Sequence, residues 1–416
     1  MTLLSRRNLL KAGAIAVPAA VLAPGTAARA AKPIPGVEMS GIAPASLAGF
    51  DNVVKKFVLD RRITAAQLAI MKSGKIVLAR GYRYNDFSRA LPTVSPTSLF
   101  RIASLSKNIT SAAIMRLVQD GKLSLSAKVT QLLGLTPLDT RMGQVTVLRL
   151  MQHLGGWDRD VSKDQLWLDH TISAALDVPL PISHADIIKY ATARRLDFDP
   201  GAKMVYSNYG YLLLGRVIEK VSGMSYESYI KTKLLQPLGI TRMRLGRSLR
   251  SEAVAGEVAY ESQYTNKSVV DTSGTVVPYQ YGGFNMPNQD ANGGWLASAV
   301  DLVRWTLAFD KPGTVLTSAS IAKLFAKPEI GVNQYGSWYG GGWWVRQVTG
   351  HLNTWHDGSM PGTFSYLARL QNGFSYAVVF NRREETGSLD FDTIDDDMNK
   401  VSVSSWPTTD LTSRYF

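Results

Sequence analysis

The spacing of apolar residues predicts one helix and one hairpin in the N-terminal part of the chain. Within residues 44–61 the apolar side chains recur at the intervals of an amphipathic helix: Leu47, Phe50, Val54, Phe57 and Val58. Two apolar runs follow, residues 65–71 and 76–82, and the short turn Lys72-Ser73-Gly74-Lys75 separates them. Apolar runs on both sides of a short glycine-containing turn are typical of a β-hairpin.

The next pattern, residues 99–121, predicts a short strand that runs directly into a helix. The apolar run Leu99–Ala103 precedes a segment whose apolar residues return at helical spacing, and Gly121 is placed to end it. Beyond this helix the strand patterns become few and helical patterns dominate, including an apolar helix at residues 211–221 that follows the turn Asp199-Pro200-Gly201.

Strand patterns return near the C-terminus. Ser298 and Asp301 resemble the capping box of a helix that runs through Phe309. Three strand-like runs follow, at residues 342–348, 362–370 and 374–381. The turn Gln371-Asn372-Gly373 between the last two is a strong hairpin signal. The acidic stretch Asp390–Asp397 lies in a predicted final helix, where its spacing favours a solvated face over a cation site.

Strands at both ends of the chain, with helices between them, indicate the fold class. The pattern predicts an α/β (α+β) fold, in which an antiparallel sheet flanked by helices is built from residues 31–118 and 293–416. A mostly helical domain is inserted at residues 119–292. We expect the strands near residues 65–82 to pair with those near residues 342–381. The start of the helix after Ala103 then lies at the seam of the two parts, where pockets tend to form.

The first thirty residues are interpreted as an export signal. The pair Arg6-Arg7 resembles a twin-arginine signal, an apolar stretch runs from Ala12 to Ala23, and Ala28-Arg29-Ala30 resembles a signal-peptidase site. The apolar stretch is too short to span a bilayer, and no later apolar run is long enough for a membrane helix. We therefore expect twin-arginine export, a mature N-terminus near Ala31, and a periplasmic or secreted protein without an integral membrane segment.

Composition narrows the set of partners. The chain has no cysteine, which excludes disulfides and lipid attachment through cysteine. Its formal charge is +13, and removal of the first thirty residues, which hold four basic and no acidic side chains, leaves +9. The basic residues are scattered, without a dense run or a nucleic-acid motif. We therefore expect no nucleic-acid partner and interpret the charge as a contribution to solubility.

Ser104 and Lys107 are the first candidates for chemistry. They are three residues apart at the start of a predicted helix, so both side chains project from one side of its first turn. A serine hydroxyl needs a nearby base, and a lysine can be that base if its pKa is lowered. Two other Ser-x-x-Lys matches, Ser228/Lys231 and Ser320/Lys323, lie inside amphipathic helical patterns, where a solvated helix face explains them.

Two later motifs complete a known pattern. Tyr206-Ser207-Asn208 and His356-Asp357-Gly358 follow Ser104-Leu105-Ser106-Lys107 in the order found in the serine β-lactamase and penicillin-binding-protein superfamily. The chain resembles the class C-like branch, with its family VIII carboxylesterases, D-aminopeptidases and D,D-carboxypeptidases. The resemblance covers nearly all of the chain after the export segment, including the run Gly293–Ser298.

The resemblance implies a role for each matching residue. Ser104 becomes acylated, and Lys107 helps to take its proton. Tyr206, as a phenolate or as a relay, shares the role of base and protonates the leaving group, for which neighbouring cations would have to lower its pKa. Asn208 orients Lys107 and binds the substrate. Around the third motif, the amide of Ser359 joins that of Ser104 in an oxyanion hole, with Gly358 and His356 beside it.

The third motif departs from the Lys-Thr-Gly of class C β-lactamases. His356 replaces a permanent cation, and an imidazole is mostly neutral above pH 7. We therefore expect an exported serine hydrolase of small carboxylic esters or of simple amides and peptides. A β-lactamase or D,D-peptidase is the alternative within the family. An inactive envelope protein that binds peptides is the alternative of another class.

The chain lacks the sequence motifs of other hydrolase classes. The chain has no Gly-x-Ser-x-Gly sequence of an α/β-hydrolase and no His-Glu-x-x-His zinc motif. His153 is interpreted as a residue that braces its glycine-rich loop. We expect no metal and no cofactor. Tryptophans such as Trp295, Trp338, Trp343 and Trp344 could line an acyl pocket, although aromatic residues are more often part of the core.

Overall fold

The computed structural model describes residues 36–88 and 90–416. The predicted export segment, residues 1–30, lies outside the described residues, so twin-arginine export stays a prediction. Residues 35–416 form one compact unit, which contains every element of the fold and the candidate site. In its described part, no helix combines the length and the apolar character needed to cross a membrane.

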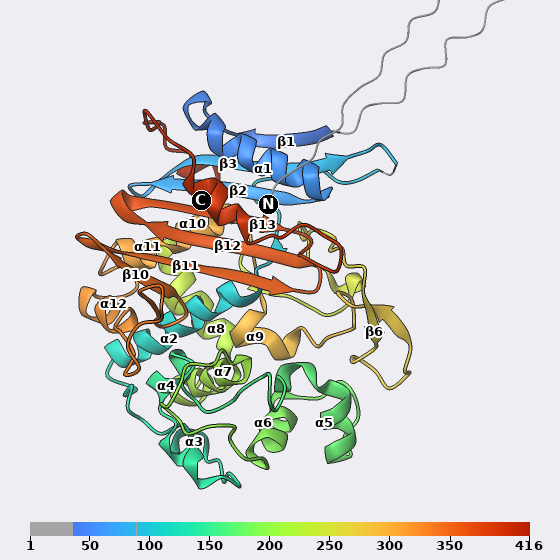
Figure 1. Ribbon diagram of the computed structural model, residues 1–416, viewed down its shortest axis with the longest axis vertical. Coiled ribbons are helices and arrows are strands. Elements are labelled where there is room, and N and C mark those ends of the chain that lie inside the picture. Colours follow the sequence, from blue (N-terminus) through green and yellow to red (C-terminus); the bar gives the residue numbers. More distant parts are fainter. Residues whose placement is uncertain (1–35, 89) are drawn as a thin grey trace, which may run out of the picture. The chain divides into compact units, whose positions relative to one another are not determined.

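The main sheet has eight strands in the order β1-β3-β2-β13-β12-β11-β10-β9, and all neighbouring strands are antiparallel. Its strands are β1 (Gly36–Ile42), β2 (Ala66–Lys72), β3 (Lys75–Asn85), β9 (Ser337–Tyr339), β10 (Trp344–Val348), β11 (His351–Met360), β12 (Thr363–Leu370) and β13 (Phe374–Phe380). β13 pairs with β2 in the register Ala377↔Ala69. This confirms the prediction that the N-terminal hairpin pairs with the C-terminal strands (Figure 1).

Three strands of this sheet were not predicted. β9 has only three residues, and β1 is a half-exposed strand at the sheet edge. β11 is the important omission, because it carries the third motif. Its sequence, HLNTWHDGSM, is polar and interrupted by Gly358. It therefore lacks the β-branched and alternating pattern that identifies a strand.

Two smaller sheets lie apart from the main one. One contains β4 (Phe100–Arg101), β8 (Trp295–Ala297) and β5 (Arg244–Leu245), in the order β4-β8-β5. The other pairs β6 (Thr265–Lys267) with β7 (Val276–Pro278). The β4-β8-β5 sheet matters for function, because it pairs the strand before Ser104 with residues of the Gly293–Ser298 run, which is part of the family resemblance.

The helices follow the predicted distribution. They are α1 (Ala48–Arg61), α2 (Ser106–Gln119), α3 (Val129–Leu133), α4 (Val147–Met151), α5 (Asp169–Leu176), α6 (His184–Thr192), α7 (Asn208–Ser222), α8 (Tyr226–Ile230), α9 (Asp290–Gly293), α10 (Ala299–Trp305), α11 (Leu307–Asp310), α12 (Ser318–Leu324) and α13 (Thr393–Asn399). Residues 119–292 thus contain helices and only three strands of two or three residues, as the sequence predicts. The assignment of that region as a separate domain stays a prediction.

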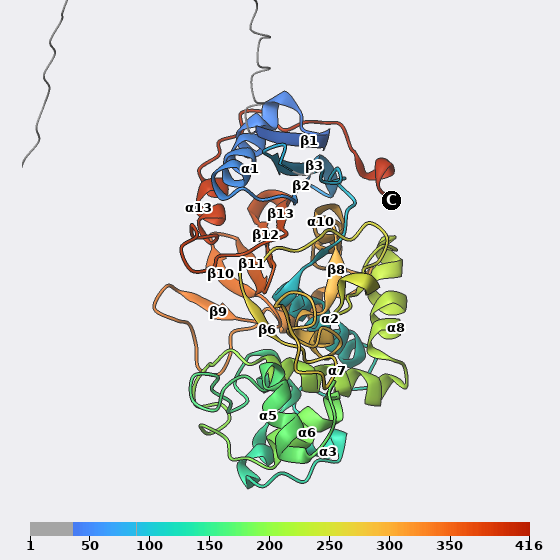
Figure 2. The same ribbon diagram turned by 90° about the vertical axis from the view of Figure 1, so that its right-hand side faces the viewer.

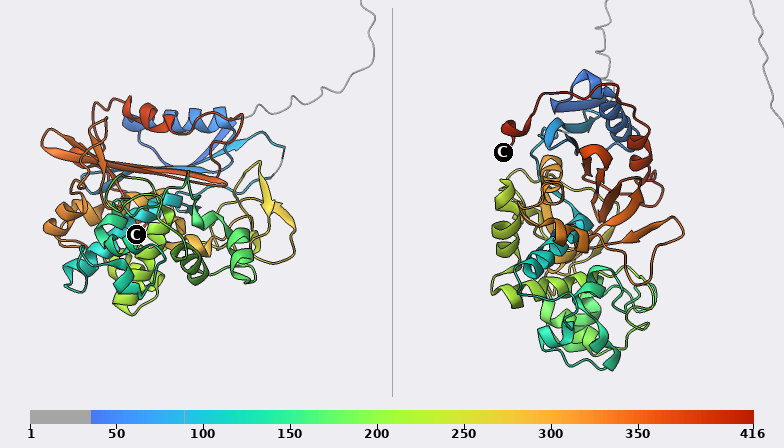
Figure 3. Two further views of the ribbon diagram at one scale, coloured as in Figure 1. Left: turned by 60° about the horizontal axis from the view of Figure 1, so that its bottom comes forward. Right: turned by 90° about the vertical axis from the view of Figure 1, so that its left-hand side faces the viewer.

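Helices cover both faces of the main sheet. The first and last helices, α1 and α13, lie together on one face, and the other helices lie on the opposite side (Figure 2; Figure 3, left). On the α1 face, Phe57 stacks on Phe380 of β13 with ring centroids 4.9 Å apart. This cluster is formed by apolar side chains of α1, of the β2–β3 and β12–β13 hairpins, and of α13. Burial of such a face is the main stabilising term for a sheet-and-helix layer.

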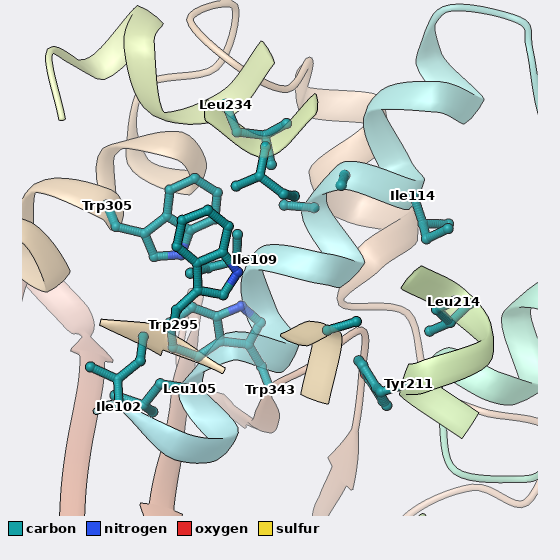
Figure 4. Packing of buried hydrophobic residues seen from close by; sticks show 14 of the residues in the cluster. Ile102, Leu105, Ile109, Ile114, Tyr211, Leu214, Leu234, Trp295, Trp305 and Trp343 are labelled. Carbon is teal, nitrogen blue, oxygen red and sulfur yellow. The ribbon is translucent and has the colours of Figure 1, made fainter. Parts of the chain in front are cut away.

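A second core surrounds α2 and extends into the helical region. Ile109 of α2, Leu214 of α7 and Trp295 of β8 are fully buried members of one continuous cluster. Figure 4 shows Trp295, Trp305 and Trp343 gathered beside α2. Because α2 is buried on nearly all sides, its first turn has a fixed position relative to both α7 and the sheet.

Candidate active site

Ser104 lies at a tight turn between a strand and the buried helix α2. The amide of Ile102 donates to the carbonyl of Trp295 at 3.0 Å, which extends the β4–β8 pairing to the edge of the turn. Ala103 then adopts a left-handed conformation with a φ of +46°. Such a conformation is costly for a residue with a side chain and is often found at functional sites. Ser104 follows within a short 3-10 turn, residues Ala103–Leu105, and its side chain is partly exposed.

Lys107 is fully buried beneath Ser104 and contacts three acceptors. Its Nζ lies 3.0 Å from Ser104 Oγ, 2.7 Å from Asn208 Oδ1 and 2.8 Å from the carbonyl oxygen of Asn292. These three contacts match the three protons of an ammonium group. Burial is the main influence on the amine, and it lowers the pKa of Lys107 to about 7. Near neutral pH the amine is therefore able to accept a proton.

Asn208 is held in one orientation by a residue that the sequence analysis missed. Asn208 Nδ2 donates to Asp164 Oδ2 at 2.6 Å, so its Oδ1 is left to face Lys107. The other oxygen of Asp164 accepts from the amide of Leu166 at 3.1 Å. The available signal was the N-cap pattern at Asp164, which begins a 3-10 turn at Gln165. That pattern predicts a turn and contains no sign of a contact with Asn208.

Tyr206 lies directly beside the Ser104–Lys107 pair. Its hydroxyl hydrogen-bonds with Ser104, and the Lys107 Nζ lies 4.7 Å from the centre of its ring. Burial raises the pKa of Tyr206 well above its ordinary value. This direction favours the relay over the phenolate, the two roles that the resemblance allows for Tyr206. Desolvation is the largest influence on this pKa.

The tyrosine motif is positioned by a helix cap and by His153. Ser207 is the N-cap of α7, because its Oγ accepts from the amide of Gly210 at 3.2 Å. His153 Nδ1 accepts from the amide of Ser207 at 3.1 Å, and its ring lies 4.3 Å from that of Tyr206. This agrees with the prediction that His153 braces its loop. Burial lowers the pKa of His153 well below its ordinary value, so the ring is neutral.

The third motif lies on β11, against the turn that carries Ser104. A Cβ at Gly358 would lie 2.3 Å from the carbonyl oxygen of Ile102 and 3.1 Å from the amide nitrogen of Ser104. Only glycine therefore allows β11 to approach this closely. Ser359 comes next and is exposed on the cavity side. The amide of Ser104 lies in the first turn of a helix, where N–H groups have no acceptor within the helix.

His356 is buried, and both of its ring nitrogens have partners inside the protein. Nε2 lies 2.8 Å from the hydroxyl of Tyr339, and Nδ1 lies 2.5 Å from the carbonyl oxygen of Asp357. The carbonyl can only accept, so Nδ1 carries the proton and Tyr339 donates to Nε2. Burial also lowers the pKa of His356. The prediction that His356 belongs to the substrate-binding and oxyanion group stays a prediction: the ring borders the cavity, and both of its nitrogens have partners inside the protein.

These residues surround a cavity of about 700 Å³. The predicted residues Ser104, Tyr206, Asn208, His356 and Ser359 line it, while Lys107 lies behind Ser104 and Gly358 behind Ser359. Several other lining residues belong to none of the sequence motifs: Arg159, Asp160, Asp164, Trp167, Met204 and Arg383. Of the four tryptophans considered for a pocket, Trp344 lines the cavity and the other three are buried in the core.

The two other Ser-x-x-Lys matches have different surroundings. Ser228 is exposed and bonds to Ser225, while Lys231 forms an ion pair with Glu227 at 2.6 Å. Ser320 lies in the first turn of α12, where its Oγ accepts from Thr317. Neither serine is near a buried amine comparable to Lys107. Within residues 36–88 and 90–416, His, Asp and Glu side chains form no group of three that could hold a metal ion.

The fold is an antiparallel sheet with helices on both faces. At one cavity it brings together the Ser-x-x-Lys motif with its buried lysine, a Tyr-x-Asn motif and the strand that carries Gly358. This combination defines the class of serine β-lactamase-fold hydrolases. Residues 50–397 match the model of the family described as Beta-lactamase, and the chain belongs to that family. Its curated relatives include Protein flp of Staphylococcus aureus (strain NCTC 8325 / PS 47), which is 29% identical over 194 residues. That match covers 46% of this chain and 36% of the relative, so the chain spans little more than a third of that protein's length.

Solved structures show the same fold. The octameric penicillin-binding protein homologue from Pyrococcus abyssi has a TM-score of 0.62 and 25% identity, over 83% of this chain and 75% of that one. The D-amino acid amidase from Ochrobactrum anthropi SV3, complexed with D-phenylalanine, has a TM-score of 0.64 and 18% identity, over 86% and 97% of the two chains. At such low identity, the likeness to the amidase shows the fold alone. The substrate of this protein has to be inferred from its own residues.

Proposed function

We propose that this protein is a serine hydrolase that forms an acyl-enzyme on Ser104 and acts on small carboxylic esters or simple amides. The observation that carries the proposal is the 3.0 Å contact between Ser104 Oγ and the buried Nζ of Lys107, whose pKa is lowered to about 7. A nucleophile and a base at hydrogen-bond distance, with the base oriented by a third group, is the arrangement that covalent catalysis requires.

Acylation begins with proton transfer from Ser104 to the neutral amine of Lys107. The Oγ atom bonds to the substrate carbonyl carbon, and the carbonyl oxygen becomes an oxyanion. The amides of Ser104 and Ser359 are the proposed donors to it, and each such donor contributes about 3 kcal/mol to transition-state stabilisation. The proton passes from Lys107 through the hydroxyl of Tyr206 to the leaving oxygen or nitrogen as the bond to carbon breaks.

Deacylation uses the same groups in the reverse direction. A water molecule takes the place of the leaving group and gives a proton through Tyr206 to Lys107, and its oxygen attacks the ester carbon. Ser104 recovers its proton when the bond to the acyl group breaks. A neutral tyrosine suits this role because a hydroxyl both accepts and donates, whereas a phenolate would only accept.

The test is intact-protein mass spectrometry after reaction with a fluorophosphonate probe. We expect one adduct on wild type, mapped to Ser104, and none on Ser104→Ala. Ser228→Ala is the matched control, since it removes a serine from a second Ser-x-x-Lys sequence that has no buried base. Full labelling of Ser104→Ala, or an adduct on Ser228, would overturn the assignment, whereas the absence of any adduct on wild type would favour the inactive peptide-binding alternative.

A substrate panel tests the class. p-Nitrophenyl esters, D-amino-acid amides and the β-lactam nitrocefin are compared by kcat/KM on the same preparation. We expect esters or simple amides to exceed nitrocefin, because the neutral His356 stands where the Lys-Thr-Gly motif of class C β-lactamases has a permanent cation. Nitrocefin turnover equal to that of the best ester would support the β-lactamase alternative.

Export by the twin-arginine route is part of the proposal. It is supported by Arg6-Arg7, the short apolar stretch and the Ala28-Arg29-Ala30 site. Replacement of both arginines by lysine should leave precursor in the cytoplasm, whereas unimpaired export of the double variant would contradict it.

A further inference from the structure

We propose that a small cavity between residues 167–171 and 266–284 binds an organic ammonium ion, held by the carboxylate of Asp169 and by three aromatic rings. The rings are those of Trp167, Tyr279 and Phe284. This site lies outside the reacting groups at Ser104, and it stands whether or not the proposed function holds. Its cavity measures about 140 Å³. Pockets for drug-sized ligands begin at roughly 300 Å³, so this one suits a small ion.

Asp169 is a buried acid that lacks a partner. It is 5% exposed, and its only hydrogen bond within the described residues comes from its own backbone amide. The three other aspartates that are buried in the described chain each have a cation beside them: Asp158 has Lys203, Asp290 has Arg216 and Asp301 has Arg242. Burial raises the pKa of Asp169 to about 7, because no nearby cation compensates its charge. A cation that enters the cavity therefore supplies the partner that this carboxylate lacks.

The three rings meet at angles that leave their faces turned toward one space. Trp167 and Tyr279 have ring centroids 6.2 Å apart at 75°, and Tyr279 and Phe284 have theirs 6.3 Å apart at 81°. Trp167 and Phe284 are tilted by 44° at 5.2 Å. The negative face of an aromatic ring attracts a cation, and several such faces around one point are a known receptor for methylated ammonium groups. Rings alone also accept a neutral apolar group, so Asp169 provides the selection for positive charge.

The surroundings of the cavity carry little positive charge of their own. Among the described residues that line it there is no lysine or arginine, and the one basic residue is His170, at the exposed rim. Arg383 influences the pKa of Tyr279 but lines the catalytic cavity instead. No charged side chain in the described part of α6, which packs against α5, influences the pKa of Asp169. A bound ammonium ion thus meets one carboxylate and no internal competitor.

The experiment compares a cation with an uncharged molecule of nearly the same shape. Choline and 3,3-dimethylbutan-1-ol differ in having a quaternary nitrogen or a carbon atom at the branch point. Each compound is titrated calorimetrically into the wild-type protein at pH 8, which needs no turnover. We expect choline to bind at least about tenfold more tightly than the alcohol, because only the cation gains from the ring faces and the carboxylate. Equal binding of the two compounds would overturn the inference.

Three variants locate the bound cation. Asp169→Asn removes the charge and keeps the shape, so it should reduce the preference for choline to within about twofold. Tyr279→Leu keeps the carboxylate but loses one ring face, and it should weaken choline binding roughly 3- to 30-fold. Asp160→Asn is the matched control, because it removes an exposed acid of the catalytic cavity and should leave the preference unchanged. Thermal melting checks that each variant is folded.

The variants also state what contradicts the site. A preference for choline that survives Asp169→Asn and disappears in Asp160→Asn would place the cation in the catalytic cavity and overturn the inference.

The pH dependence of binding identifies the carboxylate. A cation requires the ionised form of Asp169, whose pKa is about 7, so choline affinity should rise roughly tenfold between pH 6 and pH 8. This rise should vanish in Asp169→Asn. His170→Gln, which changes the rim of the cavity, should retain it. A rise that persists in Asp169→Asn and vanishes in His170→Gln would assign the effect to the rim and contradict the proposed site.

Discussion

At the scale of single residues, burial controls the charge of the central amine. Lys107 has no exposed surface, and desolvation lowers its pKa to about 7, whereas the neighbouring Asp164 acts in the opposite direction and raises it. The two effects keep the amine near the midpoint of its titration at neutral pH. Asp164 also fixes Asn208, so one carboxylate tunes both the pKa and the position of the base.

The pH dependence of hydrolysis should report this amine. A base must be unprotonated to accept the proton of Ser104, so kcat/KM for a neutral ester should rise with pH, with a midpoint near 7. Asp164→Asn removes the charge that raises the pKa of Lys107 and should move the midpoint to lower pH. Asp160→Asn, which changes an exposed acid of the same cavity, should leave it in place. A midpoint near the ordinary tyrosine value of about 10 would instead identify a phenolate as the base.

We expect the His356 ring to stabilise the fold of the site and not to contribute a charge to substrate binding. Lysine at this position offers no acceptor to the hydroxyl of Tyr339 and buries an ammonium group. We expect His356→Lys to lower the free energy of unfolding by more than about 2 kcal/mol. Urea denaturation measures this change, with Asp357→Asn, at a half-exposed neighbour, as the control.

The same variant should lose activity on neutral and carboxylate-bearing esters alike. For wild type, KM should not change between about pH 7 and 8 through His356, because burial lowers the pKa of that ring below its ordinary value of about 6.5. A selective gain of His356→Lys on carboxylate-bearing esters would show that position 356 reads substrate charge.

At the scale of elements, the site depends on how closely β11 approaches the turn before α2. Ser104 and Ser359 belong to elements far apart in the chain. The contact between these elements brings together the two amides of the proposed oxyanion hole. Gly358 makes it possible, since a side chain there would collide with the Ile102 carbonyl. The polar composition of β11 follows from the same position, as the strand faces the cavity along part of its length.

Gly358→Ala should separate these elements. An added Cβ 2.3 Å from a backbone oxygen cannot be accommodated by a side-chain rotation, so the strand must move. We expect kcat to fall at least about 100-fold, as when one oxyanion donor is lost. Gly143→Ala is the control, because a Cβ there meets no atom within 4 Å and its φ is not positive. Ester kinetics on both variants provide the measurement, and near-normal activity of Gly358→Ala would exclude a shared oxyanion hole.

At the scale of the whole molecule, an N-terminal helix and a helix near the C-terminus share one layer. α1 comes from the N-terminal side and β13 and α13 from the C-terminal side, and they meet in a single apolar cluster (Figure 3, left). The pairing of β2 with β13 closes the sheet in the same place. The site strands therefore belong to a framework that forms only when both ends of the chain have come together.

Phe57 tests that framework. It is 3% exposed and stacks on Phe380, which lies far away in the sequence. Phe57→Ala should lower the free energy of unfolding by about 3–5 kcal/mol through lost burial and a cavity. Leu59→Ala, on the same helix but 42% exposed, should change it by less than about 1 kcal/mol. Guanidinium denaturation compares the two, and similar small losses would mean that the layer relaxes around the missing ring.

The local sequence determined the elements with strong periodic patterns and the identity of the reactive groups. α1, the β2–β3 hairpin, α2, α7 and the β12–β13 hairpin follow from spacing and turn residues, because these depend on neighbours within a few positions. The Ser104 and Lys107 pair also follows, since one helical turn places both side chains together. The motif order then indicated the family that the comparison confirms.

Tertiary structure decided what the reactive groups experience. The lowered pKa of Lys107 and the neutrality of Tyr206 come from desolvation by elements distant in sequence, and burial likewise lowers the pKa of His356. Asp164 and Arg383 join the site through contacts that no local pattern encodes. Burial and orientation are properties of the packed molecule, so a sequence can name a catalytic lysine while only the fold sets its pKa.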